Sequence, residues 1–346
     1  MSVIALHKKV FLAIVAAAYA GISLIGAYTA PGSNAGKVGW SDGGELVGAN
    51  GRMGSFLLRQ SNYSLACITR EHNLDQIGMM SEPNEPIYVC TPGDAVLDVL
   101  RRIPPGRIED ACLVCNGFFP VSDNELFQHV TICVPHFGVL AVGSEPVCGT
   151  GSPPTIIHGK HAHKLKSLLL KNKTAGNGAN ILVEIEESRR GADEQAIKKL
   201  LWASILWLFT SDPSGDPTKC ITVKEAHHLY SKEIRDLVVE LLPAARRLMN
   251  EGSEQNENHD YDLMHGHLGS VSNIIAYLEA YSYSMPNATP SLELALKEVS
   301  NRNARFLRMI EETNMNPDDN QALHQKLLQR LGVDVSLHTS KIVMKH

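Results

Sequence analysis

The sequence predicts an α/β protein, in which a Rossmann domain with a mostly parallel sheet is followed by an all-helical C-terminal domain. Three observations support this fold class. From about Glu45 to Glu187, short apolar segments alternate with helical ones, as in βαβ units on a parallel sheet. A glycine-rich turn joins the first strand to the first helix. Beyond Gly191, apolar residues recur at the 3.6-residue spacing of helices.

The composition limits the functions that the chain can have. With 346 residues, 44% of them hydrophobic, it is long enough for two domains with sizeable cores. A net charge of -5 argues against nucleic-acid binding, and we expect a small-molecule ligand. Seven scattered cysteines are too few for a disulfide scaffold. A homodimer is a possible assembly of the chain. The expected parts are a targeting segment (1–40), a Rossmann domain (41–191) and a helical substrate or dimerisation domain (192–346).

The N-terminal segment has the features of a targeting leader. No charged residue lies between Lys9 and Lys37, and most of Val10–Ala30 is apolar, as in a secretory signal. The run is also long enough to cross a bilayer, so contact with a membrane is expected only if it is an uncleaved anchor; a buried core helix is the third interpretation. Gly26–Pro31 resembles the junction of signal and transit peptides in algae with secondary plastids, with Tyr28 as its aromatic residue. The plastid is the first predicted location, and the secretory pathway the second.

Short segments rich in β-formers are the expected strands of the first domain. They are Glu45–Val47, Ser64–Thr69, Pro86–Cys90, Ala111–Cys115, Thr131–Pro135, Thr155–Ile157 and Ile181–Ile185. Ser55–Gln60 and Ala95–Arg102 are expected as helices between them. Cys112 and Cys115 are three apart in one strand and therefore face opposite sides, which predicts two core cysteines rather than a metal or redox pair.

The second domain is expected to be helical, with breakers such as Asp212–Gly215 between its helices. Pro243 should kink or split the second helix. Thr222 and Glu225 have capping-box spacing at the start of that helix. The expected helices are Asp193–Thr210, Val223–Glu251, Asp260–Tyr283, Leu292–Glu312 and Gln321–Leu331.

The turn after the first strand has the composition of a phosphate-binding loop. Glycine allows close backbone approach to a pyrophosphate, and the following helix N-terminus adds partial positive charge. The spacing is G-x-x-G-x-x-G, and a plain tight turn is the alternative interpretation. The predicted cofactor-binding residues of this loop are Gly48, Asn50, Gly51, Arg52, Met53 and Gly54.

The residue at the end of the second strand discriminates between two nicotinamide cofactors. Arg70 suits the 2′-phosphate of NADP, whereas Glu71 beside it would suit the ribose of NAD. NADP is therefore the expected cofactor and NAD the less favoured one, and two solvated charges are the alternative. Thr91, in the loop after the third strand, is expected to contact the cofactor. Asn116, at the end of the fourth strand, could reach the substrate or the nicotinamide.

Together these motifs resemble the ketopantoate reductase-type oxidoreductases of the 6-phosphogluconate dehydrogenase C-terminal-like superfamily. The glycine loop, the loop Cys90–Ala95 and the strand end at Asn116 follow one another as in that family. The strand Ile181–Glu186 then leads into a helix that contains a lysine, Lys199, followed by a leucine. The resemblance spans roughly residues 45 to 310 and is strongest to a divergent algal and plant branch. It implies a two-domain, NADP-dependent reductase of a carbonyl or imine.

The resemblance assigns three catalytic roles. Lys199 would be the general acid that protonates the carbonyl oxygen, Glu298 would bind substrate and help to hold Lys199, and Asn116 would position the substrate. The residues also allow other interpretations, because Lys198 competes for the first role and Glu298 could form a surface ion pair with Arg302.

The substrate itself is defined more weakly. His136, Ser291 and Asn303 are the candidate substrate-binding residues, Asn303 because it lies five residues after Glu298 as in the family pattern. Where the family has asparagines four and eight residues after the lysine, this chain has Ala203 and Trp207. Ketopantoate itself is therefore in doubt, and a larger or more apolar carbonyl or imine is favoured. The alternative is a non-catalytic nucleotide-binding sensor or assembly protein that retains the fold.

No metal site is predicted. His158, His161 and His163 have ligand-like spacing, but no acidic residue or thiol nearby in the sequence completes a site. They are expected in a solvated turn between a strand and a helix.

Overall fold

The architecture follows from a computed structural model, which describes residues 43–69, 74–171, 181–212, 214–250, 268–290, 292–312 and 322–336. The chain divides into two units, Met1–Gly39 and Trp40–His346, and every described residue belongs to the second. The predicted targeting segment (1–40), Arg70 and Ser291 lie outside the described residues. The plastid location, the secretory alternative and the membrane anchor therefore stay predictions.

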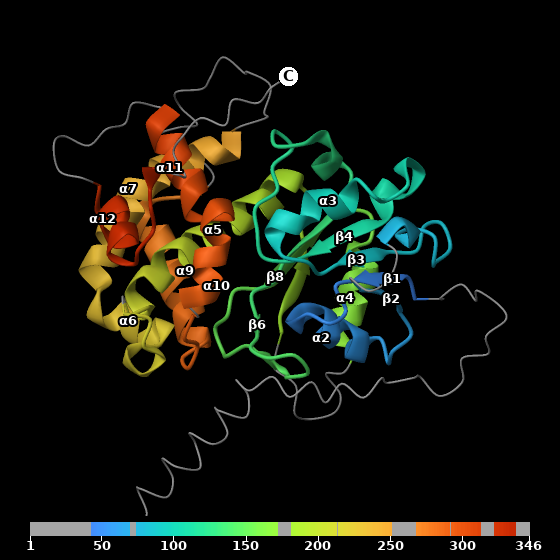
Figure 1. Ribbon diagram of the computed structural model, residues 1–346, viewed down its shortest axis with the longest axis horizontal. Helices are drawn as coiled ribbons and strands as arrows, with labels where there is room; N and C mark the ends of the chain where they lie inside the picture. The colour runs from blue at the N-terminus through green and yellow to red at the C-terminus, as the bar shows by residue number, and fades with distance from the viewer. Residues whose placement is uncertain are drawn as a thin grey trace, which may run out of the picture. The chain divides into compact units, whose positions relative to one another are not determined.

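The first half of the described chain is built on a seven-stranded sheet with the order β2-β1-β3-β4-β5-β8-β9 (Figure 1). Every pair of neighbours is parallel except β5 and β8. All seven expected strands are present, most of them a residue or more shorter than expected. Their bounds are β1 Glu45–Val47, β2 Ala66–Ile68, β3 Ile87–Val89, β4 Ala111–Val114, β5 Thr131–Val134, β8 Thr155–His158 and β9 Val183–Ile185. The sequence analysis missed a small hairpin, β6 (Gly138–Val139) with β7 (Pro146–Val147).

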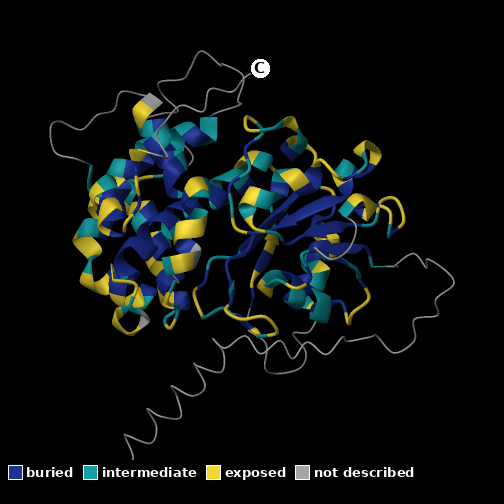
Figure 2. Ribbon diagram, in the orientation of Figure 1, coloured by how far each residue is buried: buried dark blue, intermediate teal, exposed yellow. Residues whose placement is uncertain are grey.

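Helices cover both faces of this sheet (Figure 1), and most residues of the strands between them are buried (Figure 2). The helices α2 (Arg52–Gln60) and α4 (Ala162–Leu170) pack on one face, and α3 (Val96–Leu100) and the start of α5 (Arg189–Thr210) on the other. Side chains alternate between the two faces along each strand. Cys112 and Cys115 are buried in different core clusters, which confirms the prediction that they face opposite sides.

The second half is helical, as predicted. After α5 come α6 Val223–Leu229, α7 Ser231–Asn250, α9 Val271–Ser284, α10 Leu292–Glu298, α11 Asn303–Glu312 and α12 Leu323–Arg330. The fold class is therefore a Rossmann-type α/β domain followed by a helical region. Nowhere in the described ranges is a helix long and apolar enough to cross a membrane.

Two of the expected helices are divided. The second breaks at Tyr230, where φ is −117° and ψ is 29°, and not at Pro243, which lies inside α7. The ring of Tyr230 stacks on Phe209 with centroids 5.1 Å apart, so the residue at this break is held by a tertiary contact. The fourth expected helix is interrupted after Glu298 by a 3₁₀ turn, Val299–Asn301. The capping box of Thr222 and Glu225 is confirmed.

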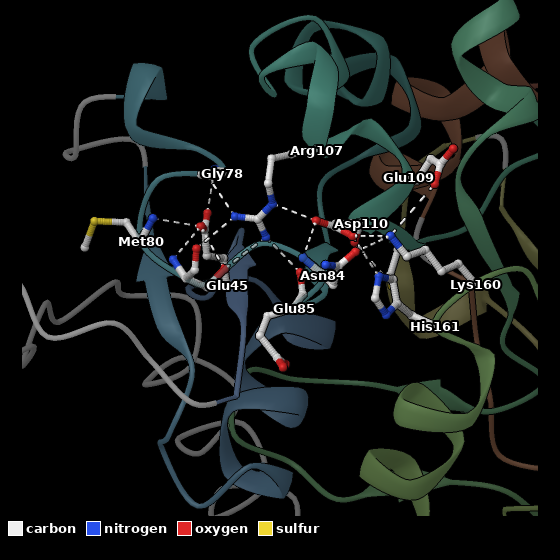
Figure 3. Close-up of polar contacts among 12 residues, drawn as sticks. Glu45, Gly78, Met80, Asn84, Glu85, Arg107, Glu109, Asp110, Lys160 and His161 are labelled. Atoms are coloured by element: carbon white, nitrogen blue, oxygen red, sulfur yellow. Dashed lines mark hydrogen bonds and ion pairs between the residues drawn. The ribbon is translucent and has the colours of Figure 1, made fainter.

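A buried polar network joins the strand ends opposite the glycine loop (Figure 3). Glu45 is fully buried and accepts hydrogen bonds from the backbone N–H groups of Gly78, Met80 and Ser81 at 2.7, 2.8 and 2.9 Å. Arg107 donates to the backbone oxygens of Gly78 and Ser81, both at 2.9 Å, and pairs with Asp110 at 2.6 Å. Because each buried charge has partners, this network fixes several loops to the sheet.

His161 belongs to this network, which corrects the expectation of a solvated turn. Its ring is buried and its Nε2 lies 3.2 Å from Asp110 Oδ1, while Lys160 pairs with the same oxygen at 2.9 Å (Figure 3). The acidic partner is 51 residues away in the sequence, so its proximity depends on the fold. Of the other two histidines, His158 is half-buried and His163 is exposed.

Candidate nucleotide and substrate site

The glycine loop makes a close backbone turn between β1 and α2. Gly48 has a φ of +87°, and a Cβ placed there would lie 2.8 Å from the carbonyl oxygen of Cys90. A Cβ at Gly54 would lie 2.1 Å from the carbonyl oxygen of Gly48. These two glycines therefore allow the loop, β3 and the first turn of α2 to approach one another more closely than other residues would permit.

The N-terminus of α2 is open to an anion. Its cap residue, Gly51, gives no side-chain hydrogen bond to the first turn, and that turn contains no acidic residue. Arg52 is the first helical residue and is exposed, as is Asn50 before it. The helix dipole and the Arg52 charge therefore favour a negatively charged group at this end. The Met53 side chain packs against the core, so only the backbone amide of Met53 is available to a ligand at the loop.

Thr91 provides a second indication of a ligand beside this loop. Its hydroxyl oxygen is buried and has no hydrogen-bond partner within the described protein. The backbone nitrogen of Thr91 is 3.5 Å from the position of a Cβ at Gly48, so the residue adjoins the glycine loop. A buried hydroxyl without a partner is unfavourable, and a ligand group could supply the partner. The glycine cradle, the open helix end and Thr91 together fit the phosphates of a dinucleotide.

Replacing Gly54 by alanine should weaken both the fold and dinucleotide binding. The added methyl would overlap the Gly48 carbonyl, so α2 must move away from the loop, at a cost of about 1–3 kcal/mol. Thermal unfolding and nucleotide titration measure the two effects. Gly106→Ala is the matched control, because a Cβ at Gly106 meets nothing within 4 Å. Equal effects of the two substitutions would contradict the assigned role of Gly54.

A cavity of about 460 Å³ lies between the carboxyl ends of the strands and the helical half. Arg52 of the glycine loop lines it, together with Asn116 at the end of β4. Its other charged lining residues are Lys199 from α5, Glu298 at the end of α10, and Arg302. Residues far apart in the sequence thus meet in one space of ligand size.

Lys199 is buried and lines this cavity. Its ammonium donates a hydrogen bond to Asn116 Oδ1 at 2.7 Å and another to the carbonyl oxygen of Pro135. Burial and, less strongly, the Arg302 charge lower the pKa of Lys199 to about 7, against the opposing effects of Cys133, Cys115 and Glu298. The structure thus brings Lys199 to Asn116, a contact that the sequence analysis did not predict, whereas Lys198 pairs with Glu194 at 2.5 Å.

Glu298 forms an ion pair with Arg302, the alternative interpretation of its sequence spacing. The pair is not a surface bridge, however, because the two side chains are 22% and 17% exposed and both line the cavity. Burial lowers the pKa of Arg302, which Glu298 partly opposes. Arg302 is a site residue that the sequence analysis considered only as a surface partner. The signal for it was the i, i+4 spacing from Glu298.

Two predicted substrate residues lie outside the cavity lining. His136 is 1% exposed, with Nδ1 2.7 Å from the Pro154 carbonyl and Nε2 2.5 Å from the Tyr277 hydroxyl. Burial lowers the pKa of His136 to about 3, so the ring is neutral at pH 7. Asn303 is fully buried and uses its amide within the fold, with Trp207 and Ser204 among its partners. The structure gives neither residue a direct contact with the cavity.

Ala203 and Trp207, the residues that replace the family's asparagines, do line the cavity. The pocket wall beyond Lys199 is therefore more apolar than the family pattern implies. Arg70 and Ser291 lie outside the described residues, so their predicted roles stay predictions.

Comparisons with known proteins give similarities of structure alone. No protein-family model matches the chain, and no curated protein is significantly similar to it. A ketopantoate reductase of the PanE/ApbA family from Ralstonia eutropha aligns at 14% identity over 84% of this chain and 98% of its own, with a TM-score of 0.47. D-mandelate dehydrogenase in complex with NADH aligns at 12% identity over 85% and 99%, with a TM-score of 0.48. A putative 2-dehydropantoate 2-reductase from Enterococcus faecalis aligns at 13% identity over 85% and 98%, with a TM-score of 0.41.

Proposed function

We propose that this chain is a divergent ketopantoate reductase-like oxidoreductase, of an algal or plant branch, that uses NADPH to reduce a small carbonyl or imine. The observation that carries the proposal is Lys199: a buried lysine with a pKa of about 7, hydrogen-bonded to Asn116. It lines the same cavity as Arg52 of the glycine loop. A general acid works best when its pKa is near the working pH.

Each side chain of the site has its own role in the proposed reaction. A bound nicotinamide would supply the hydride. The protonated Lys199 donates a proton to the substrate oxygen or nitrogen, and its hydrogen bonds to Asn116 and Pro135 fix the direction of the ammonium. Proton donation leaves a neutral amine, which the buried surroundings favour over the ammonium. Glu298 and Arg302 shift the pKa of Lys199 in opposite directions and so tune its proton affinity.

The test of this function has two steps. Purified protein is titrated with NADPH and with NADH by nucleotide fluorescence, and NADPH oxidation is then screened with 2-oxo acids, aldehydes and imines. We expect saturable binding of NADPH and oxidation with at least one class of substrate. If neither nucleotide binds, the proposed function is wrong.

The preference for NADPH over NADH rests on Arg70 at the end of the second strand segment. Replacing Arg70 by aspartate removes the charge that would bind the 2′-phosphate and adds one that binds a ribose hydroxyl. We expect the ratio of NADPH to NADH affinity to fall by about tenfold or more. An unchanged ratio would separate Arg70 from the phosphate site.

A non-catalytic nucleotide sensor or assembly protein is the second candidate. It is favoured by Ala203 and Trp207, which put carbon where the family pattern has amide groups that bind substrate. Tight NADPH binding without turnover of any carbonyl or imine would favour this candidate over the enzyme.

A further inference from the structure

The direction of the Lys199 ammonium depends on an acceptor outside the cavity lining. The ammonium donates one hydrogen bond to the side chain of Asn116, at 2.7 Å, and another to the backbone carbonyl of Pro135. Asn116 lines the cavity, whereas Pro135, which follows directly after β5, is not among its described lining residues. A backbone carbonyl cannot turn without its planar peptide group. The direction of the ammonium therefore depends on what holds the peptide between Pro135 and His136.

Thr155 holds the N–H group of this peptide. It is the first residue of β8, which runs antiparallel to β5. Its Oγ1 accepts a hydrogen bond from the backbone N–H of His136 at 3.0 Å, and both residues are 1% exposed. The peptide is trans, so its N–H and its carbonyl point in opposite directions. The bond to Thr155 thus directs the Pro135 carbonyl to the other side, where Lys199 lies.

The remaining polar atoms of His136 are also used within the protein. Its Nδ1 lies 2.7 Å from the carbonyl oxygen of Pro154, which can only accept, so Nδ1 carries the proton of the neutral ring. Nε2 therefore accepts a hydrogen bond from the hydroxyl of Tyr277, in α9, at 2.5 Å. The backbone carbonyl of His136 accepts from Ser152 Oγ at 2.8 Å. These contacts leave His136 little freedom to rotate, so the peptide that precedes it is kept in one orientation.

We infer that Thr155 and His136 are positioning residues for Lys199. They act through the peptide that they hold, and they keep the Pro135 carbonyl fixed as an acceptor for the buried ammonium. When this acceptor is displaced, Asn116 remains, and a buried ammonium with fewer acceptors is less stable relative to the neutral amine. The use of the ammonium as a proton donor rests on the proposed function, whereas the arrangement of its acceptors does not.

Neither positioning residue adds a charge beside Lys199. Burial and, less strongly, the Lys199 charge lower the pKa of His136 to about 3, so its ring is neutral at pH 7, and threonine does not ionise. The groups whose charges act on the pKa of Lys199 are Cys133, Arg302, Cys115 and Glu298. A substitution of Thr155 leaves all four in the chain. A change in the pKa of Lys199 caused by this substitution therefore reports the position of the carbonyl acceptor.

Competitive labelling of lysine amines tests this inference without requiring turnover. Full-length protein is acylated with trace acetic anhydride over a range of pH, and fragment-ion mass spectrometry resolves Lys199 from Lys198. Thr155→Val removes the hydroxyl and keeps a side chain of similar shape, so the pKa of Lys199 should fall from about 7 by about one pH unit. Thr155→Ser keeps the hydroxyl and should keep the wild-type value. An unchanged pKa in Thr155→Val would overturn the inference.

Thr131→Val is the matched control for this substitution. Thr131 is fully buried in β5, and its Oγ1 accepts from the backbone N–H of His161 at 3.0 Å, the same kind of bond as that of Thr155. Thr131 is the first residue of β5, whereas Pro135 follows the last. Both substitutions should lower the free energy of unfolding in urea, but only Thr155→Val should lower the pKa of Lys199. An equal fall in both variants would assign the effect to lost stability and reject the positioning role.

Tyr277→Phe decides the outcome if Thr155→Val does not fold. It removes the hydroxyl that donates to His136 Nε2 and keeps the aromatic ring. The peptide then loses an indirect support, so the pKa of Lys199 should fall by about half a pH unit. If Lys199 kept its wild-type pKa in this variant, the inference would be wrong.

Single-turnover rates separate this inference from the proposed function. A lower pKa of Lys199 in Thr155→Val, when the wild type oxidises NADPH with no carbonyl or imine, would reject the enzymatic function and retain the positioning role. Where a carbonyl is reduced, the pH at which the rate falls should be lower in Thr155→Val than in the wild type, by the amount found in the labelling. Reduction with the same pH profile in both proteins would reject the positioning role and retain the enzymatic function.

Discussion

Replacing Lys199 by methionine should lower the rate of NADPH-dependent reduction by about 10²–10⁴-fold. Methionine keeps a long side chain in the same buried space but cannot donate a proton. Steady-state kcat on the best carbonyl found in the screen measures the effect, and NADPH titration shows whether the nucleotide site is intact. Lys198→Met is the matched control, because Lys198 pairs with Glu194 rather than with Asn116. If only Lys198→Met lowered the rate, the proton donor would be Lys198 and not Lys199.

The dependence of the rate on pH should report the same group. Burial lowers the pKa of Lys199 to about 7, and reduction requires its protonated form. The rate should therefore be highest below pH 7 and fall as the pH rises through about 7. A profile that stays flat from pH 6 to 9, with chemistry limiting the rate, would exclude Lys199 as the proton donor. Single-turnover rates should be measured, because slow product release would hide the effect of pH on the chemical step.

Replacing Arg107 by alanine should destabilise the fold by about 3–5 kcal/mol. Arg107 is 7% exposed, pairs with Asp110 at 2.6 Å and donates to three backbone carbonyls, those of Gly78, Ser81 and Glu85 (Figure 3). Its removal leaves these oxygens without a buried donor. Urea unfolding monitored by circular dichroism gives the free energy of unfolding.

Arg102 provides the control for this substitution. Its ion pairs with Asp75 and Asp98 are solvent-exposed, at 3.3 and 3.7 Å, so Arg102→Ala should cost less than about 1 kcal/mol. Similar losses for the two arginines would show that the buried network contributes little to stability.

Acid should weaken the same network in a defined range. Burial raises the pKa of Asp110, but hydrogen bonds from Lys160, Arg107 and His161 outweigh it and hold the pKa at about 2. Since the folded pKa is below the ordinary value of 3.8, Asp110 contributes stability above that value. This contribution is lost as the pH falls from about 4 towards 2. In Arg107→Ala one of the hydrogen bonds that lower the pKa of Asp110 is absent, so the pH-dependent part of the free energy of unfolding should become smaller.

The local features of the fold could be predicted from the sequence because neighbouring residues determine them. The strand pattern, the glycine turn, the opposite faces of Cys112 and Cys115 and the capping box at Thr222 each depend on a few consecutive residues. The breaker Asp212–Gly215 could be predicted in the same way, because it lies between α5 and α6, but the break at Tyr230 could not. The ring of Tyr230 stacks on Phe209, 21 positions earlier, a contact that only the fold shows, and Pro243 is accommodated within α7.

The site shows the same division. The sequence alone determined the fold class, the glycine loop and the residue types of Lys199, Asn116 and Glu298. Only the tertiary structure decided their surroundings. Through burial it set the pKa of Lys199, it made Glu298 and Arg302 a partly buried ion pair in the cavity lining, and it joined His161 to Asp110. Burial and charge interactions depend on distances in space, which the packing of sheet and helices sets and which separation along the chain does not reveal.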